Sequence, residues 1–150
     1  MRAVLAALTM LTAAGADYLV SPPAQRTTLA VEGGEVVLSN GLLRRVWTVK
    51  PDCATVGYDN LLTGTSLIRG VKPEARLTLD GAERSVGGLK GQPDYAYLRR
   101  DWISSLTADP GAIHCTGYAP AEIRSTMEWK RVRHAASAAW PPKGAGVVFH

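Results

Sequence analysis

Residues 35–49 read EVVLSNGLLRRVWTV, and they combine two strand patterns with a turn signal. Both of its ends are rich in valine, leucine, tryptophan and threonine, which favour strands over helices. Between them stands Asn40-Gly41, among the strongest short turn signals, because both residues tolerate a positive φ. The stretch therefore predicts two strands, 35–39 and 42–49, that are joined by a tight turn.

The same alternation of short apolar runs and turns continues on both sides of this stretch. Upstream, a strand at 27–31 is followed by a Gly-Gly turn, and downstream Asp80-Gly81 predicts a second hairpin. The segment 95–106 fits either a strand or a helix. Short strands at roughly ten-residue spacing are typical of an antiparallel β-sandwich, so residues 27–150 are predicted to form one all-β domain. The downstream strands are predicted at 54–58, 75–79, 83–86, 112–118 and 147–149.

The composition is that of an ordinary globular protein. The chain has 150 residues, of which 46% are hydrophobic and 20% are charged, so one domain with an apolar core is expected. The formal net charge of +4 is mild, and the basic residues are scattered. A nucleic-acid interface usually shows a basic stripe within a recognisable module, and none is present, so no nucleic-acid partner is predicted.

The N-terminus has the pattern of an export signal. A short positive region is followed by the apolar run 4–14 and then by Ala14-Gly15-Ala16, small residues that suit signal peptidase. Residues 1–16 are therefore predicted to be a signal peptide that is removed near Ala16. The run is too short to span a membrane. Residues 17–26, which contain Pro22-Pro23, are predicted to be an extended lead-in, and the protein is predicted to be secreted or periplasmic.

Export makes Cys53 and Cys115 candidate disulfide partners. A bridge between them would close a loop of about sixty residues. Two buried free thiols are an equal alternative at this point.

No catalytic or cofactor-binding constellation stands out. The chain has no glycine-rich nucleotide motif, and His114 and Cys115 are adjacent, so in a strand their side chains would point to opposite faces. No metal site and no cofactor are predicted. Sugar hydrolysis generally uses two carboxylates, and no spacing in the sequence singles out a pair. Asp52 with Asp59, or Asp94 with Asp101, would suggest a hydrolase only if they lined one pocket.

The aromatic residues Tyr95, Tyr97 and Trp102 form the most suggestive cluster. Charged side chains at 99–101 stand among them. Aromatic faces beside charged hydrogen-bonding groups suit sugar rings, which have apolar C–H faces and polar edges. Tyr95 and Tyr97 would share one face if the segment were a strand. The alternative is that these rings belong to the core or bury against a neighbouring domain.

The stretch from Leu38 to Leu98 resembles a known kind of domain. LSNGLLRRVWTV, ATVGYDNLLTGTSLI and PEARLTLDGAERSVGGL are similar to the opening of galactose-mutarotase-like β-sandwiches, which precede the catalytic barrel in several glycoside hydrolase families, including α-galactosidase-like enzymes. The shared pattern is an Asn-Gly turn, the turn 60–64 (NLLTG) and an Asp-Gly hairpin. The resemblance implies a non-catalytic role, because the catalytic carboxylates of such enzymes lie in the later barrel.

The last residues, WPPKGAGVVFH, bear on how this domain is completed. A strand beginning at Val147 with no later partner would leave an open apolar edge, which proteins usually protect. We therefore expect an incomplete supersandwich whose chain continues past His150. The alternative is that this strand pairs with an earlier one. The predicted function is the N-terminal portion of a secreted carbohydrate-active enzyme, with glycan or a downstream catalytic domain as its partner. The alternative is a stand-alone secreted module that binds glycan or protein.

Overall fold

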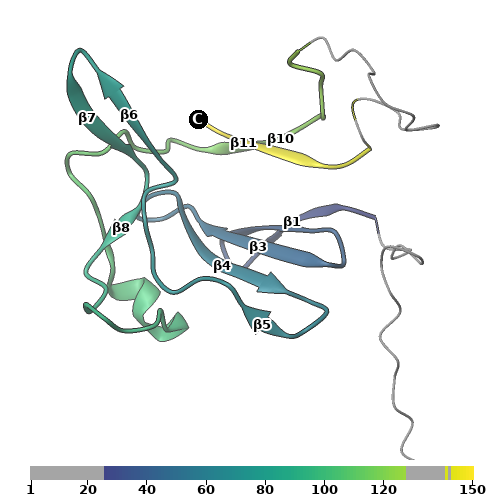
Figure 1. Ribbon diagram of the computed structural model, residues 1–150, viewed down its shortest axis with the longest axis horizontal. Coiled ribbons are helices and arrows are strands. Elements are labelled where there is room, and N and C mark those ends of the chain that lie inside the picture. The colour runs from purple at the N-terminus through teal and green to yellow at the C-terminus, as the bar shows by residue number, and fades with distance from the viewer. Residues whose placement is uncertain (1–25, 128–140, 142) are drawn as a thin grey trace, which may run out of the picture.

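The computed structural model describes residues 26–127, 141 and 143–150. Over these residues the chain consists of antiparallel strands and one short 3-10 helix (Figure 1), so the predicted all-β class is confirmed. The predicted signal peptide, residues 1–16, lies outside the described residues, as does the predicted lead-in as far as residue 25. In chain order the elements are β1 (Thr28–Glu32), β2 (Glu35–Ser39), β3 (Leu43–Thr48), β4 (Ala54–Asn60), β5 (Thr65–Ser66), β6 (Ala75–Leu79), β7 (Ala82–Val86), β8 (Leu89–Lys90), the 3-10 helix η1 (Arg100–Ser105), β9 (Thr107–Ala108), β10 (Tyr118–Ala121) and β11 (Gly146–Phe149).

The largest sheet is a meander of five strands in the order β1-β2-β3-β4-β5. The Asn40-Gly41 turn connects β2 to β3 as predicted. The Asn40 side-chain oxygen accepts hydrogen bonds from the backbone N–H groups of Leu42 and Leu43, at 3.0 and 2.8 Å. This cap sets the register, in which Val37 stands opposite Val46.

One face of this sheet carries the main core. Alternate side chains of the strands point to it, and later segments of the chain cover it. Leu98, which precedes η1, and Ile103, which lies within η1, pack against the same cluster. Its buried members are Val37, Val46, Ala54, Val56, Val71, Leu89 and Leu106.

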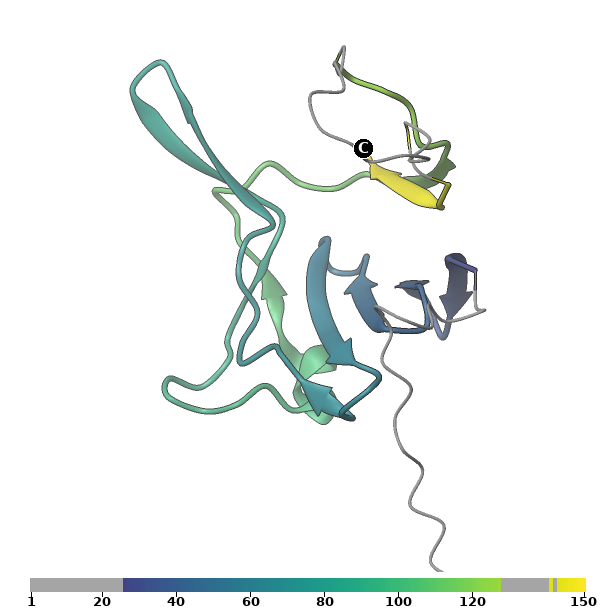
Figure 2. The ribbon, with the colours of Figure 1, turned by 45° about the vertical axis from the view of Figure 1, so that its right-hand side comes forward.

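The opposite face is partly covered by the β10–β11 hairpin, which Figure 2 shows lying above the sheet. Buried Val36 and Trp47 form the second apolar cluster, and the Phe149 ring lies 5.5 Å from the Trp47 ring. Tyr118 packs against the same cluster. A two-stranded hairpin thus faces a five-stranded sheet, and a full β-sandwich stays a prediction.

The β6–β7 hairpin projects from the rest of the molecule (Figures 1 and 2). Its Asp80-Gly81 turn is confirmed, and Leu77 stands opposite Arg84 in the ladder. Leu77 and Leu79 are exposed, at 43% and 53%.

The structure differs from the sequence predictions at two places. Residues 112–117 form no strand and make only an isolated bridge, from Ile113 to Val86. The N–H group of Cys115 instead donates a hydrogen bond to the buried carboxylate of Asp52, so it cannot donate to a neighbouring strand. The segment 95–106 forms a loop followed by η1, and Tyr95 has a φ of 61°, which no strand residue adopts. The condition under which Tyr95 and Tyr97 would share a strand face is therefore not met.

The strand predicted at 147–149 is confirmed as part of β11. It pairs antiparallel with β10, and Tyr118 stands opposite Phe149. The main-chain ladder continues through two hydrogen bonds between His150 and the residues just before β10. The alternative of an earlier partner for this strand is the one observed.

Candidate functional site

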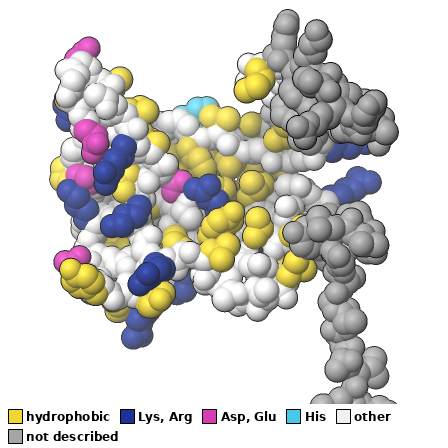
Figure 3. All heavy atoms as spheres, viewed as in Figure 1, with side chains coloured by type: hydrophobic (Ala, Val, Ile, Leu, Met, Phe, Trp, Pro, Cys, Tyr) yellow, Lys and Arg dark blue, Asp and Glu magenta, His cyan; other side chains and the backbone are white. Residues whose placement is uncertain are grey.

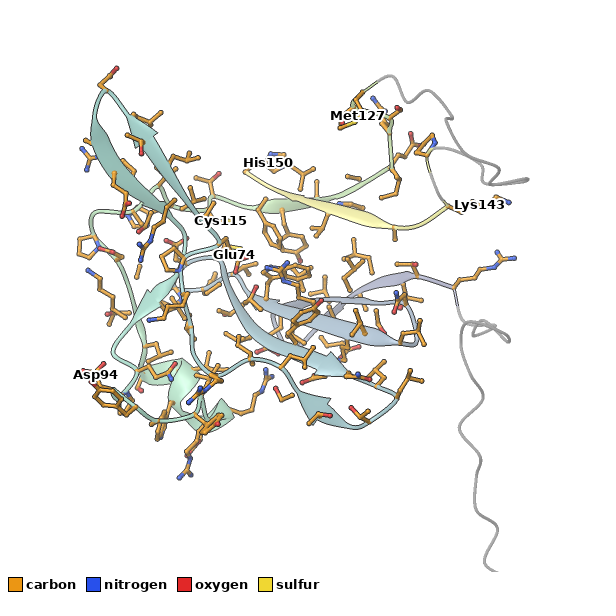
Figure 4. The ribbon with its side chains drawn as sticks, viewed as in Figure 1. Glu74, Asp94, Cys115, Met127, Lys143 and His150 are labelled. Atoms are coloured by element: carbon orange, nitrogen blue, oxygen red, sulfur yellow. The ribbon has the colours of Figure 1, made fainter. Side chains whose placement is uncertain are left out.

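The candidate site is a hollow of about 320 Å³ between two loops, where Tyr95 lies. One loop follows β5 and the other follows β8, and the structure brings them together on the side of the core that faces away from β10–β11. Figure 4 labels Asp94 in this region, at the outer edge of the molecule. The lining residues are Arg69, Gly70, Val71, Lys72, Leu89, Lys90, Gly91, Gln92, Pro93, Asp94, Tyr95 and Ala96.

The Gln92 side chain holds the two loops in place. Its Oε1 accepts from the backbone N–H of Val71 at 2.9 Å. Its Nε2 donates to the backbone carbonyls of Arg69 and Ala96, at 3.2 and 2.9 Å. These contacts satisfy three backbone groups of the two loops. A Cβ added at Gly70 would stand 3.0 Å from Gln92 Nε2, so a larger residue there would require the Gln92 side chain to shift. The hollow is therefore a built feature of the fold.

Of the predicted aromatic residues, Tyr95 lines this hollow, and Tyr97 contacts it only through Arg69. The Tyr95 side chain is fully exposed, and Tyr97 is 65% exposed. The guanidinium of Arg69 lies 4.8 Å from the centre of the Tyr97 ring, which is a cation–π distance. Neither ring belongs to a core cluster, so the alternative that these tyrosines are buried in this domain does not hold.

Trp102 is not among the residues that line this hollow. It lies in η1, half-buried, with the Arg99 guanidinium 5.5 Å from its ring centre. Arg99 also makes a two-pronged ion pair with Asp101, at 3.0 and 2.8 Å, and this hydrogen bonding lowers the pKa of Asp101. The predicted trio of aromatic residues is thus divided: Tyr95 lines the hollow, Tyr97 contacts the lining residue Arg69, and Trp102 lies in η1.

The chemistry of the hollow is polar and mostly positive. Arg69, Lys72 and Lys90 supply cations, and Asp94 supplies one carboxylate. Figure 3 shows Lys and Arg side chains over this part of the visible face, beside patches of apolar surface. Exposed rings next to amide and charged donors can hold a polar ligand with a flat apolar face. They offer neither an activated nucleophile nor a pair of carboxylates.

Neither carboxylate pair considered in the sequence lines one hollow among the described residues. Asp52 is fully buried, whereas Asp59 makes an ion pair with Arg44 at 3.5 Å. Asp94 lines the hollow, but Asp101 does not. The two-carboxylate requirement for a glycosidase is therefore not met by either pair.

A second polar cluster is centred on Glu74, which no sequence motif marks. Its Oε2 accepts from Arg45 at 2.6 Å and from the indole N–H of Trp47 at 3.3 Å, and its Oε1 accepts from the Thr55 N–H at 2.6 Å. Arg45 also lies 4.7 Å from the Trp47 ring centre. The sequence carries no sign of this cluster, because Glu74 comes from a loop far along the chain. It ties that loop to β3 and β4.

A third cluster joins two parts of the chain that are far apart in sequence. Asp52, which is fully buried, accepts hydrogen bonds from the N–H groups of Cys53 and Cys115 through one oxygen, at 2.8 and 2.9 Å. Its other oxygen lies 2.7 Å from Nδ1 of His114. The pairs Asp52-Cys53 and His114-Cys115 were visible in the sequence, but their contact depends on the fold. Both cysteines are free in the structure.

Among the described residues, no group of three or more His, Cys, Asp or Glu side chains could hold a metal ion. None of the helices in the described ranges is long and apolar enough to cross a membrane. Comparison with known proteins finds no matching family model, no similar curated protein and no similar solved structure.

Proposed function

We propose that this chain is the non-catalytic β-sandwich portion of an exported carbohydrate-active enzyme, and that it contacts glycan at the Tyr95 hollow. The observation that carries the glycan contact is the exposed ring of Tyr95 in a hollow lined by amide and charged groups, with the exposed ring of Tyr97 against the lining residue Arg69. Rings in this setting can stack on the C–H face of a sugar while neighbouring donors bind its hydroxyl groups.

The charge around the hollow favours a glycan that carries negative charge. Three cationic side chains line it against one carboxylate. One of them, Lys90, is paired with Asp109 at 2.9 Å, which leaves Arg69 and Lys72 as the cations best placed to meet a ligand. An acidic oligosaccharide is therefore expected to bind more tightly than a neutral one of the same length, and the difference should shrink as salt is added.

The experiment is calorimetric titration of the chain with matched neutral and uronic-acid-containing oligosaccharides. Tyr95→Ala should weaken binding by about tenfold or more, which corresponds to roughly 1.4 kcal/mol. Tyr95→Phe keeps the ring and is the matched control, so its affinity should stay close to that of the wild type. Equal binding by the wild type and Tyr95→Ala, or no binding to any oligosaccharide, would overturn the glycan contact.

The place of the chain in a larger enzyme needs a separate test. The intact mass of the native product can be read with an antibody raised against residues 17–150. A product several times heavier than the chain's 16.0 kDa would support the proposal. A product slightly lighter than this mass would support signal cleavage and the alternative of a stand-alone binding module.

A further inference from the structure

We infer that Cys53 and Cys115 are a dithiol–disulfide pair, which closes by exchange with an external disulfide such as oxidised glutathione. The bond would join the start of β4 to the segment that leads into β10. This inference is independent of the glycan site, which lies elsewhere in the fold.

The first observation is that one carboxylate oxygen holds both cysteines. Oδ1 of Asp52 accepts from the N–H of Cys53 at 2.8 Å and from the N–H of Cys115 at 2.9 Å. The two backbones are therefore fixed next to each other by a fully buried residue. A second bond, from the Gly88 N–H to the Cys53 carbonyl at 2.7 Å, fixes the Cys53 side of the pair further.

The second observation is that the side chains also meet. Cys53 is a buried member of the apolar cluster around Trp47, and Cys115 packs against this cluster. The pKa of the Cys53 thiol is raised to about 12, first by burial and then by the proximity of Cys115, and a hydrogen bond between the two side chains contributes. Two cysteines whose N–H groups share one carboxylate oxygen, and which meet at one apolar cluster, need little backbone movement to form a bond.

The different burial of the two thiols sets the order of reaction. Cys53 is 3% exposed, whereas Cys115 is half-buried, and Figure 4 labels it on the segment that leads toward β10. An external disulfide can therefore reach Cys115 but not Cys53. The Cys115 thiol accordingly reacts first, and Cys53 is the resolving thiol.

The chemistry balances in two exchange steps. The Cys115 thiolate attacks one sulfur of the external disulfide, forms a mixed disulfide and releases one small thiol. The Cys53 sulfur then attacks the Cys115 sulfur, forms the internal disulfide and releases the second small thiol. The protein gives up two electrons and two protons, and the external disulfide takes them up as two thiols.

The test is to incubate the purified chain with oxidised glutathione, trap free thiols with iodoacetamide and measure the intact mass. The wild type should lose two hydrogens and take up no iodoacetamide, while a sample reduced with dithiothreitol and unfolded in urea should take up two equivalents. Two alkylatable thiols after prolonged oxidation, or a disulfide between two chains, would overturn the inference.

Single variants test the order. Cys53→Ser should stop at a glutathione adduct on Cys115, because the resolving thiol is missing. Cys115→Ser, kept folded, should take up no adduct, because Cys53 is buried. The reverse pattern, with an adduct on Cys53 in Cys115→Ser and none on Cys115 in Cys53→Ser, would contradict the assigned roles. Circular dichroism of each variant checks that it is folded.

Discussion

Asp52 joins the start of β4 to the segment that leads into β10. It is fully buried and holds the N–H groups of Cys53 and Cys115 together with the ring of His114. Asp52→Ala would leave two buried donors without a partner, so we expect a loss of about 3–5 kcal/mol in the free energy of unfolding. Asp52→Asn should cost less, because an amide oxygen can still accept from both N–H groups.

Urea unfolding followed by tryptophan fluorescence measures these changes. The control is Asp94→Ala, because this exposed side chain should change the free energy of unfolding by no more than about 0.5 kcal/mol. A stability of Asp52→Ala equal to that of the wild type would contradict the role assigned to this carboxylate.

Also at the residue scale, Cys53 makes stability depend on pH. Burial raises the pKa of its thiol from 9.0 to about 12. The folded state therefore keeps its proton where the unfolded state loses it, so this contribution is complete below pH 9 and is lost as the pH rises toward 12. The free energy of unfolding of the reduced protein should fall across this window.

Urea titrations of reduced protein at several pH values above 9 check this decline. Cys53→Ala removes the thiol and leaves all other titrating groups in place, so its stability should decline less steeply. Parallel curves for the two proteins would show that Cys53 has no part in the pH dependence.

At the scale of elements, the turn after β7 depends on a close approach of two backbones. Gly87 has a φ of 56°, and a Cβ added there would collide with the Cys53 carbonyl oxygen. Gly81 also has a positive φ, of 76°, but open space surrounds it. Gly87→Ala should therefore lower the melting temperature much more than Gly81→Ala, which should cost only about 1–2 kcal/mol of backbone strain. Thermal unfolding by circular dichroism compares the two, and equal shifts would contradict the close approach.

The β10–β11 hairpin is held to the large sheet through Phe149. Its ring lies 5.5 Å from the Trp47 ring and 6.4 Å from the Tyr118 ring. Phe149→Ala should cost about 3 kcal/mol and should speed hydrogen exchange in β10 and β11 more than in β2 and β3. Val148→Ala is the matched control, because this neighbouring side chain is 46% exposed. Uniform exchange changes in all four strands would contradict separate docking of the hairpin.

The elements could be predicted from sequence where local signals decided them. Asn40-Gly41 and Asp80-Gly81 predicted the positions of their hairpins correctly, because a turn residue acts within a few residues of its own position, through a positive φ at Gly41, Asp80 and Gly81 and through the side-chain oxygen of Asn40. The segment 112–117 was wrongly predicted to be a strand, because the Cys115 N–H binds Asp52, a partner 63 residues away. The conformation of the Tyr95 loop could not be predicted for the same kind of reason, because Gln92 orders this loop through contacts to residues 69 and 71. Sequence periodicity carries no record of such contacts.

At the scale of the whole molecule, the cysteine pair should control thermal stability. A disulfide between Cys53 and Cys115 would close a loop of about sixty residues and stabilise the fold by roughly 4 kcal/mol. The oxidised protein should therefore melt roughly 10 °C or more above the reduced protein. Scanning calorimetry with and without dithiothreitol measures the difference. A variant with both cysteines changed to serine should show no response to dithiothreitol, and equal melting of the two wild-type forms would contradict the prediction.

The contact between Trp47 and Phe149 also affects how the protein folds during its synthesis. The two rings meet across about a hundred residues of chain, although the sheet that carries Trp47 has only local, sequential strand pairings. On a translating ribosome, the five-stranded sheet can assemble early, but the covering of its Trp47 face is incomplete until residues 146–149 have been added. During that interval the nascent chain presents an apolar surface to the cell, and a chaperone that shields such surfaces would be its first binding partner.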